Sequence, residues 1–197
     1  MDKQKIANDI IDKALSLVAE DGWNQATLAS GAVLAGYKKT DVVRVFPNGA
    51  IDAIEAYARM VDAQMLEALS HYNLTTMKIR QKITSAIRLR LELQLPHREA
   101  IRKAVALHSQ PLNYHRGLRS LYTTLDTIWR GIGDISTDYN FYTKRLTLAG
   151  VYSSSLLIWL DDNSIGQEAT WAFLDRRIEG VIKFEKIKHK IQNWRCI

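Results

Sequence analysis

Few residues of this chain have the types and spacing that catalysis or metal binding requires. The chain has five histidines: His71, His97, His108, His115 and His189. None of them has metal-ligand spacing, and Pro111 separates His108 from His115. The sequence contains no Ser-His-Asp or Cys-His set and no glycine-rich phosphate loop, and its one cysteine is Cys196. We therefore expect a non-enzymatic protein with no catalytic residue, no metal site and no cofactor.

One cation lies within an apolar stripe. Phe141, Arg145, Leu148 and Tyr152 follow one another at spacings of four, three and four, which is the periodicity of one helix face. The pattern predicts a half-buried helix over 137–160 that carries Arg145 among apolar side chains. Arg145 could form an ion pair with Asp138 or with a neighbouring helix. Phe141 and Tyr142 point about 100° apart on that helix, so one of the two rings is expected to be exposed.

The elements that position these residues are all helical. Apolar residues recur at helical spacing throughout, and no alternating strand pattern persists. The predicted helices cover 6–21, 26–34, 40–46, 51–72, 76–95, 98–109, 114–131, 137–160 and 167–194. Apolar residues make up 47% of the chain and charged residues 24%, which excludes disorder as the main state. We expect an all-α protein.

The basic charge is unevenly distributed along the chain. Residues 1–50 hold six basic and six acidic residues, whereas 75–130 and 175–197 carry the whole excess behind the net charge of +6. The last helix is amphipathic, and we expect five of its residues to contact a membrane surface: Phe184, Ile187, Lys190, Ile191 and Trp194. It could instead pack on the domain or pair with its copy in a homodimer. The longest apolar stretch, 146–160, is shorter than the roughly 20 residues of a membrane span.

Residues 1–60 resemble the helix-turn-helix half of TetR-type regulators. The resemblance rests on the Gly22-Trp23 step, the turn at Gly36 and the Pro47-Asn48-Gly49 corner. Such regulators usually end the recognition helix in Tyr-x-Tyr-Phe-x-x-Lys, whose Tyr and Lys hold DNA phosphates, but Val43 and Gly49 occupy those positions here. We therefore expect a TetR-like helical bundle with an N-terminal module (1–74) that has lost DNA binding, and a helical domain (75–197).

The segment from Leu125 to Arg145 resembles the signature of the ubiquinone-biosynthesis accessory family known as coenzyme Q nine. The matching residues are Asp126, Trp129, Gly133, Asp134, Ser136, Thr137, Asp138, Asn140, Phe141, Tyr142, Thr143 and Arg145, then Thr170, Trp171, Phe173, Leu174, Arg177 and Ile178. One departure is the turn at Gln110-Pro111-Leu112-Asn113-Tyr114, where the family's usual Leu-Pro-Gln-Asn-x-Pro is absent.

The resemblance implies a non-enzymatic protein whose C-terminal helices bind lipid. Its ligand would be an isoprenoid or quinone precursor or a phospholipid, and its partner a late-step hydroxylase of ubiquinone synthesis. By position, Arg145 would hold the lipid head group, with Leu148 and Tyr152 beside it, and Phe141 and Tyr142 would contact the hydroxylase. The location would be cytoplasmic, peripheral at the inner membrane. The alternative is a TetR-type transcriptional repressor with a lipid or aromatic effector.

Overall fold

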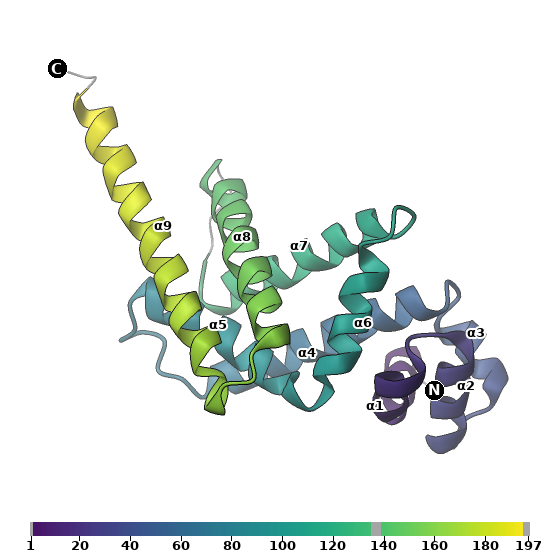
Figure 1. Ribbon diagram of the computed structural model, residues 1–197. Helices are drawn as coiled ribbons and strands as arrows, with labels where there is room; N and C mark the ends of the chain where they lie inside the picture. Colours follow the sequence, from purple (N-terminus) through teal and green to yellow (C-terminus); the bar gives the residue numbers. More distant parts are fainter. Residues whose placement is uncertain (1, 135–138, 195–197) are drawn as a thin grey trace.

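The computed structural model describes the backbone of residues 2–134 and 139–194, and the side chains of 2–134 and 142–181. Within these ranges the chain forms nine α-helices and two short 3₁₀ helices, with no strand (Figure 1). The α-helices are α1 (Lys3–Asp21), α2 (Gln25–Leu34), α3 (Lys39–Val45), α4 (Ala50–Ser70), α5 (Ile79–Leu93), α6 (Arg98–His108), α7 (Tyr114–Gly131), α8 (Tyr139–Asp161) and α9 (Glu168–Trp194). The prediction of an all-α fold is confirmed. None of the helices in the described ranges combines the length and the apolar character needed to cross a membrane.

The helix ends follow from local chemistry. Gly22 ends α1 with a φ of 79°, a left-handed conformation that glycine adopts without steric cost, and its N–H donates to the Val18 carbonyl. Asn24 begins α2 by accepting a hydrogen bond from the Thr27 N–H. Pro96 lies in the short 3₁₀ helix after α5, where it cannot continue the α-helix.

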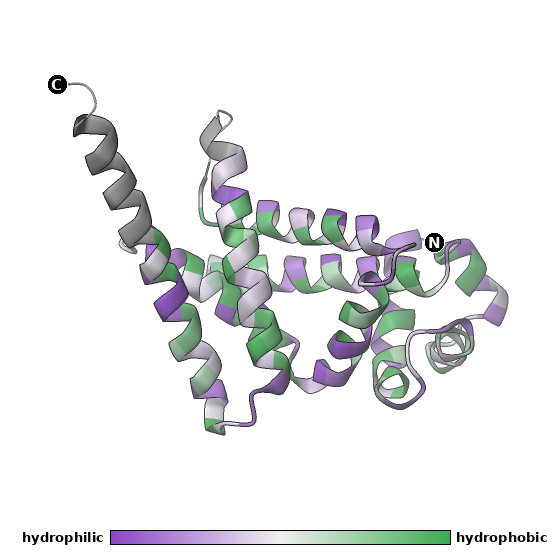
Figure 2. Cartoon of the chain, turned by 45° about the horizontal axis from the view of Figure 1, so that its top comes forward, coloured by the Kyte–Doolittle hydropathy of each residue, from purple (hydrophilic) through white to green (hydrophobic). Residues whose placement is uncertain are grey.

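The first three helices form a module at one end of the molecule, and α4 connects it to the others (Figure 1). Helix α4 packs against α1 and also contacts α5 and α7. Figure 2 shows hydrophobic and hydrophilic residues recurring along the helices, as expected for helices that each bury one face. The predicted division at 74/75 falls between α4 and α5, and it stays a prediction.

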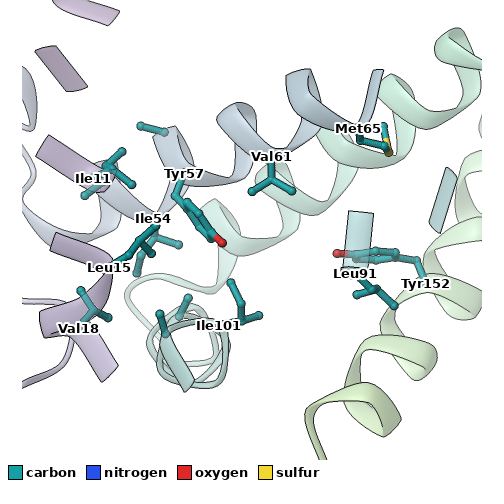
Figure 3. Packing of buried hydrophobic residues seen from close by; sticks show 14 of the residues in the cluster. Ile11, Leu15, Val18, Ile54, Tyr57, Val61, Met65, Leu91, Ile101 and Tyr152 are labelled. Carbon is teal, nitrogen blue, oxygen red and sulfur yellow. The ribbon is translucent and has the colours of Figure 1, made fainter. Parts of the chain in front are cut away.

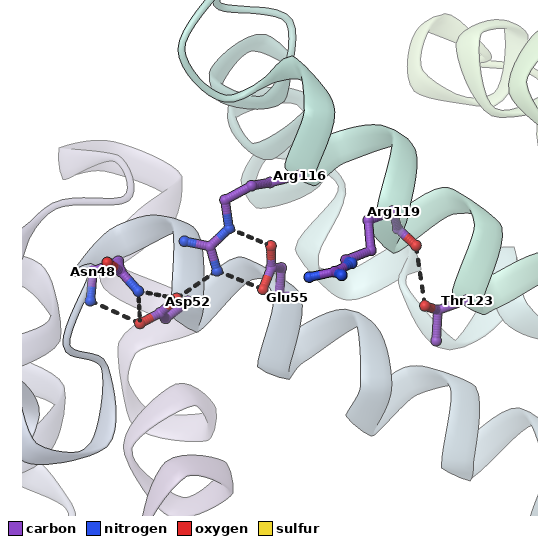
Figure 4. A network of polar contacts seen from close by, with 6 residues as sticks. All are labelled: Asn48, Asp52, Glu55, Arg116, Arg119 and Thr123. Carbon is purple, nitrogen blue, oxygen red and sulfur yellow. Dashed lines mark hydrogen bonds and ion pairs between the residues drawn. The ribbon is translucent and has the colours of Figure 1, made fainter.

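One continuous cluster of buried apolar residues runs from the N-terminal module into the C-terminal helices (Figure 3). Trp23 connects the two regions directly, because its Nε1–H donates to the Ala100 carbonyl of α6 at 2.8 Å. A polar contact on the surface adds to this connection (Figure 4). There Arg116 of α7 donates from Nε to Glu55 of α4 at 2.7 Å and also pairs with Asp52.

Candidate functional site

Arg145 lies at the corner between α7 and α8, where it is only 3% exposed. Its Nε donates to Asp126 of α7 at 2.8 Å, and its Nη1 lies 3.7 Å from the Asp134 carboxylate. The structure therefore places Arg145 in an ion pair with a neighbouring helix, one of the alternatives that the sequence left open. Asp138, the other suggested partner, lies outside the described residues.

The same corner holds a second cation of the signature segment. The Nζ of Lys144 lies 2.6 Å from Asp134 and 5.5 Å from the centre of the Trp129 ring, a distance at which a cation interacts with the ring face. Asp126 and Trp129 of α7, with Asp134 just after this helix, thus contact two cations of α8. Several residues of the signature segment therefore hold α7 and α8 together.

A mostly apolar cavity of about 270 Å³ adjoins this corner, and we call it the signature cavity. It lies between α5, α7, α8 and α9. Its lining residues are Ile79, Arg80, Ile83, Trp129, Thr143, Lys144, Thr147, Leu148, Val151, Ile178 and Val181. Trp129 is buried, and its Nε1 has no hydrogen-bond partner among the described residues.

The three residues expected to contact lipid do not meet in one cavity. Leu148 lines the signature cavity, whereas Tyr152 lines a separate pocket between α4, α5, α6, α7 and α8. Arg145 is absent from both linings. The lipid contact of Arg145 therefore stays a prediction, and the cations that line the signature cavity are Arg80 and Lys144.

Tyr152 belongs to a buried polar network that sequence reasoning missed. Arg90 donates from Nε to Asp62 at 2.7 Å and from Nη1 to Gln94 at 3.1 Å, and it also contacts the Tyr152 hydroxyl. Burial opposes the charge of Arg90, but Tyr152 and Asp62 raise its pKa above the usual value. Burial raises the pKa of Tyr152. Nothing in the sequence singles out Arg90, because helical periodicity does not show which residues of other helices it contacts.

Tyr142 lies on the outer side of α8 and is 67% exposed. Leu146, one turn later, is also exposed, so the two form a small apolar surface beside the α7–α8 corner. The side chain of Phe141 lies outside the described residues. So do those of the residues expected at the membrane: Phe184, Ile187, Lys190, Ile191 and Trp194.

Over the described residues, no group of His, Cys, Asp and Glu side chains has the arrangement of a metal site.

Residues 114–185 match the family model described as COQ9, and these residues include the α7–α8 corner and much of the signature cavity. The chain is also similar to three proteins named "Ubiquinone biosynthesis protein COQ9, mitochondrial". It is 29% identical to that of Rattus norvegicus, 30% to that of Drosophila melanogaster and 26% to that of Homo sapiens. The resemblance to the coenzyme Q nine family is confirmed.

The similarity to the COQ9 proteins extends over 89% of this chain in each of these three comparisons. The chain spans a little over half the length of these relatives, namely 58%, 55% and 57% respectively.

The fold also matches that of a solved protein. The TetR transcriptional regulator from Nitrosomonas europaea ATCC 19718 aligns with a TM-score of 0.70, covering 89% of this chain and 97% of that one, at 16% sequence identity. The expected TetR-like fold is therefore confirmed. At this identity the likeness concerns the fold alone.

Proposed function

We propose that this chain acts in ubiquinone biosynthesis as a non-enzymatic lipid-binding protein. It binds an isoprenoid or quinone precursor in the signature cavity and presents it to a hydroxylase of the pathway. The observation that carries the proposal is the coincidence of two features: the COQ9 match over 114–185 and an apolar cavity lined largely by residues of that segment.

The size of the signature cavity supports partial enclosure of the ligand. Pockets that enclose a drug-sized molecule measure about 300–1,000 Å³, and this cavity has a volume of about 270 Å³. It would take a few isoprene units, with the remaining tail left outside. A polyprenyl precursor is nearly insoluble in water, so a protein that covers part of it lowers the cost of moving it from the bilayer to an enzyme.

The polar groups at the signature cavity support a ligand with an oxygen-bearing head. Lys144 and Arg80 carry positive charge at its wall, where they pair with Asp134 and Glu179 respectively. Thr143 and Thr147 add hydroxyl groups. A phenolic, quinone or phosphate oxygen suits this set, which is why phospholipid stays an alternative ligand.

The exposed Tyr142 and Leu146 support a protein partner close to the cavity. Tyrosine is one of the residue types that most often contribute the binding energy at the centre of an interface, and Tyr142 and Leu146 lie on the helix that also lines the cavity. Phe141 stays the second proposed contact with the hydroxylase. The contacts of the C-terminal helix with an inner membrane, its pairing in a homodimer and a cytoplasmic location stay parts of the proposal.

Native mass spectrometry of the purified chain tests the proposal. We expect a retained lipid in the wild type and its loss in Ile83→Trp, because the indole would fill the signature cavity from α5. Leu93→Trp is the matched control, since Leu93 lies on the same helix and is not part of the cavity lining. An Ile83→Trp protein that folds and retains the lipid would contradict the proposed site.

A further inference from the structure

The turn between α3 and α4 contains the pair Asn48-Gly49. Asn48 is exposed, and Gly49 has a φ of 67°, a left-handed conformation that suits a residue without a Cβ. The backbone nitrogen that follows an asparagine can attack the carbonyl carbon of the asparagine side chain. Glycine hinders this attack least, because no side chain stands beside its nitrogen. The residues of this turn therefore favour deamidation of Asn48.

Hydrogen bonds hold both reacting groups of this pair (Figure 4). The Nδ2 of Asn48 donates to the two carboxylate oxygens of Asp52, each at 3.1 Å, and its backbone N–H donates to one of them at 2.7 Å. The N–H of Gly49 donates to the Phe46 carbonyl at 2.9 Å. The Gly49 nitrogen can therefore attack Asn48 only when these bonds open.

A second contact, from another helix, orients Asp52. Arg116 of α7 pairs with Asp52 and with Glu55, both on α4. Burial would raise the pKa of Asp52, but the hydrogen bonds from Asn48 and Arg116 outweigh it and lower the pKa below its usual value. Asp52 is therefore ionised near pH 7 and accepts hydrogen bonds from both residues. The turn at Asn48 and the contact between α4 and α7 thus share one carboxylate.

We propose that Asn48 is a deamidation site that Asp52 restrains, and that its modification weakens the contact between α4 and α7. A bond forms between the Gly49 nitrogen and the side-chain carbonyl carbon of Asn48. The carbon–nitrogen bond of the amide breaks, and ammonia leaves with the proton of the Gly49 N–H. Water then opens the cyclic imide at either carbonyl, which gives aspartate or isoaspartate at position 48. This inference does not depend on the proposed function.

The modification would reverse the interaction between positions 48 and 52. An amide that donates to both oxygens of Asp52 becomes an anion beside them, and like charges at this distance repel each other. Arg116 would then have three carboxylates near it in place of two. The N-terminus of α4 attracts negative charge, but Asp52 already lies in its first turn. We therefore expect the modified chain to be less stable.

Peptide mapping by mass spectrometry tests the site, with the full chain incubated in a mildly alkaline buffer. We expect Asn48 to convert at least about tenfold faster than Asn73, an exposed asparagine that leucine follows. Asp52→Ala should accelerate the reaction of Asn48 further, because it removes the acceptor of the Asn48 amide. The matched control is Glu67→Ala, which removes an exposed carboxylate from the same helix and should leave the rate unchanged.

Arg116→Gln tests the restraint without changing a residue of the turn. The rate at Asn48 should lie between those of the wild type and Asp52→Ala, because this variant loses only the cation that orients Asp52. Circular dichroism checks that each variant keeps the helical content of the wild type. Conversion of Asn48 no faster than that of Asn73 would overturn the site. Equal rates in the wild type, Asp52→Ala and Arg116→Gln would overturn the restraint.

Asn48→Asp reproduces the charge of one product and tests the effect on the fold. Its melting temperature should fall by about 2–4 °C. The same change in an Asp52→Ala background should have little effect, because the opposing carboxylate is absent. Asn73→Asp, which adds the same charge in another exposed turn, serves as the control. An unchanged melting temperature for Asn48→Asp, or an equal fall in both backgrounds, would contradict the weakened contact.

Discussion

Arg145 is bound so closely by carboxylates that its removal should mainly lower the stability of the fold. Arg145→Ala would leave Asp126 and Asp134 without this cation at the α7–α8 corner. We expect a loss of about 3 kcal/mol in the free energy of unfolding, the lower end for breaking a buried pair, because Asp126 retains some exposure. Chemical denaturation of the wild type and of Arg145→Ala measures this loss.

The two roles of Arg145 can be distinguished by a double-mutant cycle with Asp126→Asn. A structural pair predicts that the two changes together cost less than their sum, while the folded fraction of each variant still carries lipid. A head-group contact predicts normal stability and lost lipid. Arg145→Lys should restore only part of the stability, because an ammonium cannot make the paired contacts of the guanidinium with Asp126.

We expect Tyr142 to contribute to the binding of a partner but not to the stability of the fold. Because its side chain is 67% exposed, we expect Tyr142→Asp to change the free energy of unfolding by less than about 0.5 kcal/mol. Capture of the quinone hydroxylase should fall by at least tenfold if the ring is an interface anchor. A pull-down beside a thermal melt measures both quantities, and Tyr122→Asp serves as the surface control. Undiminished capture by a folded Tyr142→Asp protein would remove the residue from the interface.

At the scale of elements, the turn before α9 depends on one carboxylate. Asp162 accepts hydrogen bonds from the backbone N–H and hydroxyl of Ser164, and from those of Thr170, at 2.6 to 2.8 Å. Burial would raise the pKa of Asp162, but these four donors outweigh it and hold the pKa well below the usual value.

The pH dependence of this turn follows from the lowered pKa. A carboxylate whose pKa is lower in the folded state stabilises the fold above its unfolded pKa of about 3.9, and the contribution is lost as the pH falls toward the folded value. We expect Asp162→Asn to cost about 2 kcal/mol at pH 7, with the difference from wild type shrinking below about pH 4. Denaturation at several pH values measures it, and Asp161→Asn should change little because Asp161 is exposed. A pH-independent difference would contradict this role.

The helices could be predicted from the sequence far better than the contacts between them. Gly22, Asn24 and Pro96 determine helix ends locally, so the expected and observed bounds agree closely. The partner of Arg145 is Asp126, 19 residues earlier and across a corner. Helical periodicity identifies which face is buried, but it does not identify which helix lies opposite. The two cavities were unpredictable for the same reason.

For the whole molecule, the TetR-like fold raises the question of DNA binding. We expect none at sub-micromolar concentration, because residues 1–50 have no net charge and the phosphate-contacting positions hold Val43 and Gly49. Val43 is 60% exposed on α3, so an apolar side chain stands where a phosphate ligand would be needed. A mobility shift over genomic fragments checks this, and a tight, salt-dependent complex would favour the repressor alternative.

The bond between Trp23 and α6 also makes this indole a natural optical probe of the pocket that Tyr57 and Tyr152 line. Trp23 donates to the Ala100 carbonyl, and its ring lies 6.1 Å from that of Tyr57, a residue of the pocket lining. A ligand that moves α6 or Tyr57 alters the surroundings of the indole and hence its emission. The difference between the fluorescence titrations of the wild type and of Trp23→Phe would therefore report occupancy without any added label.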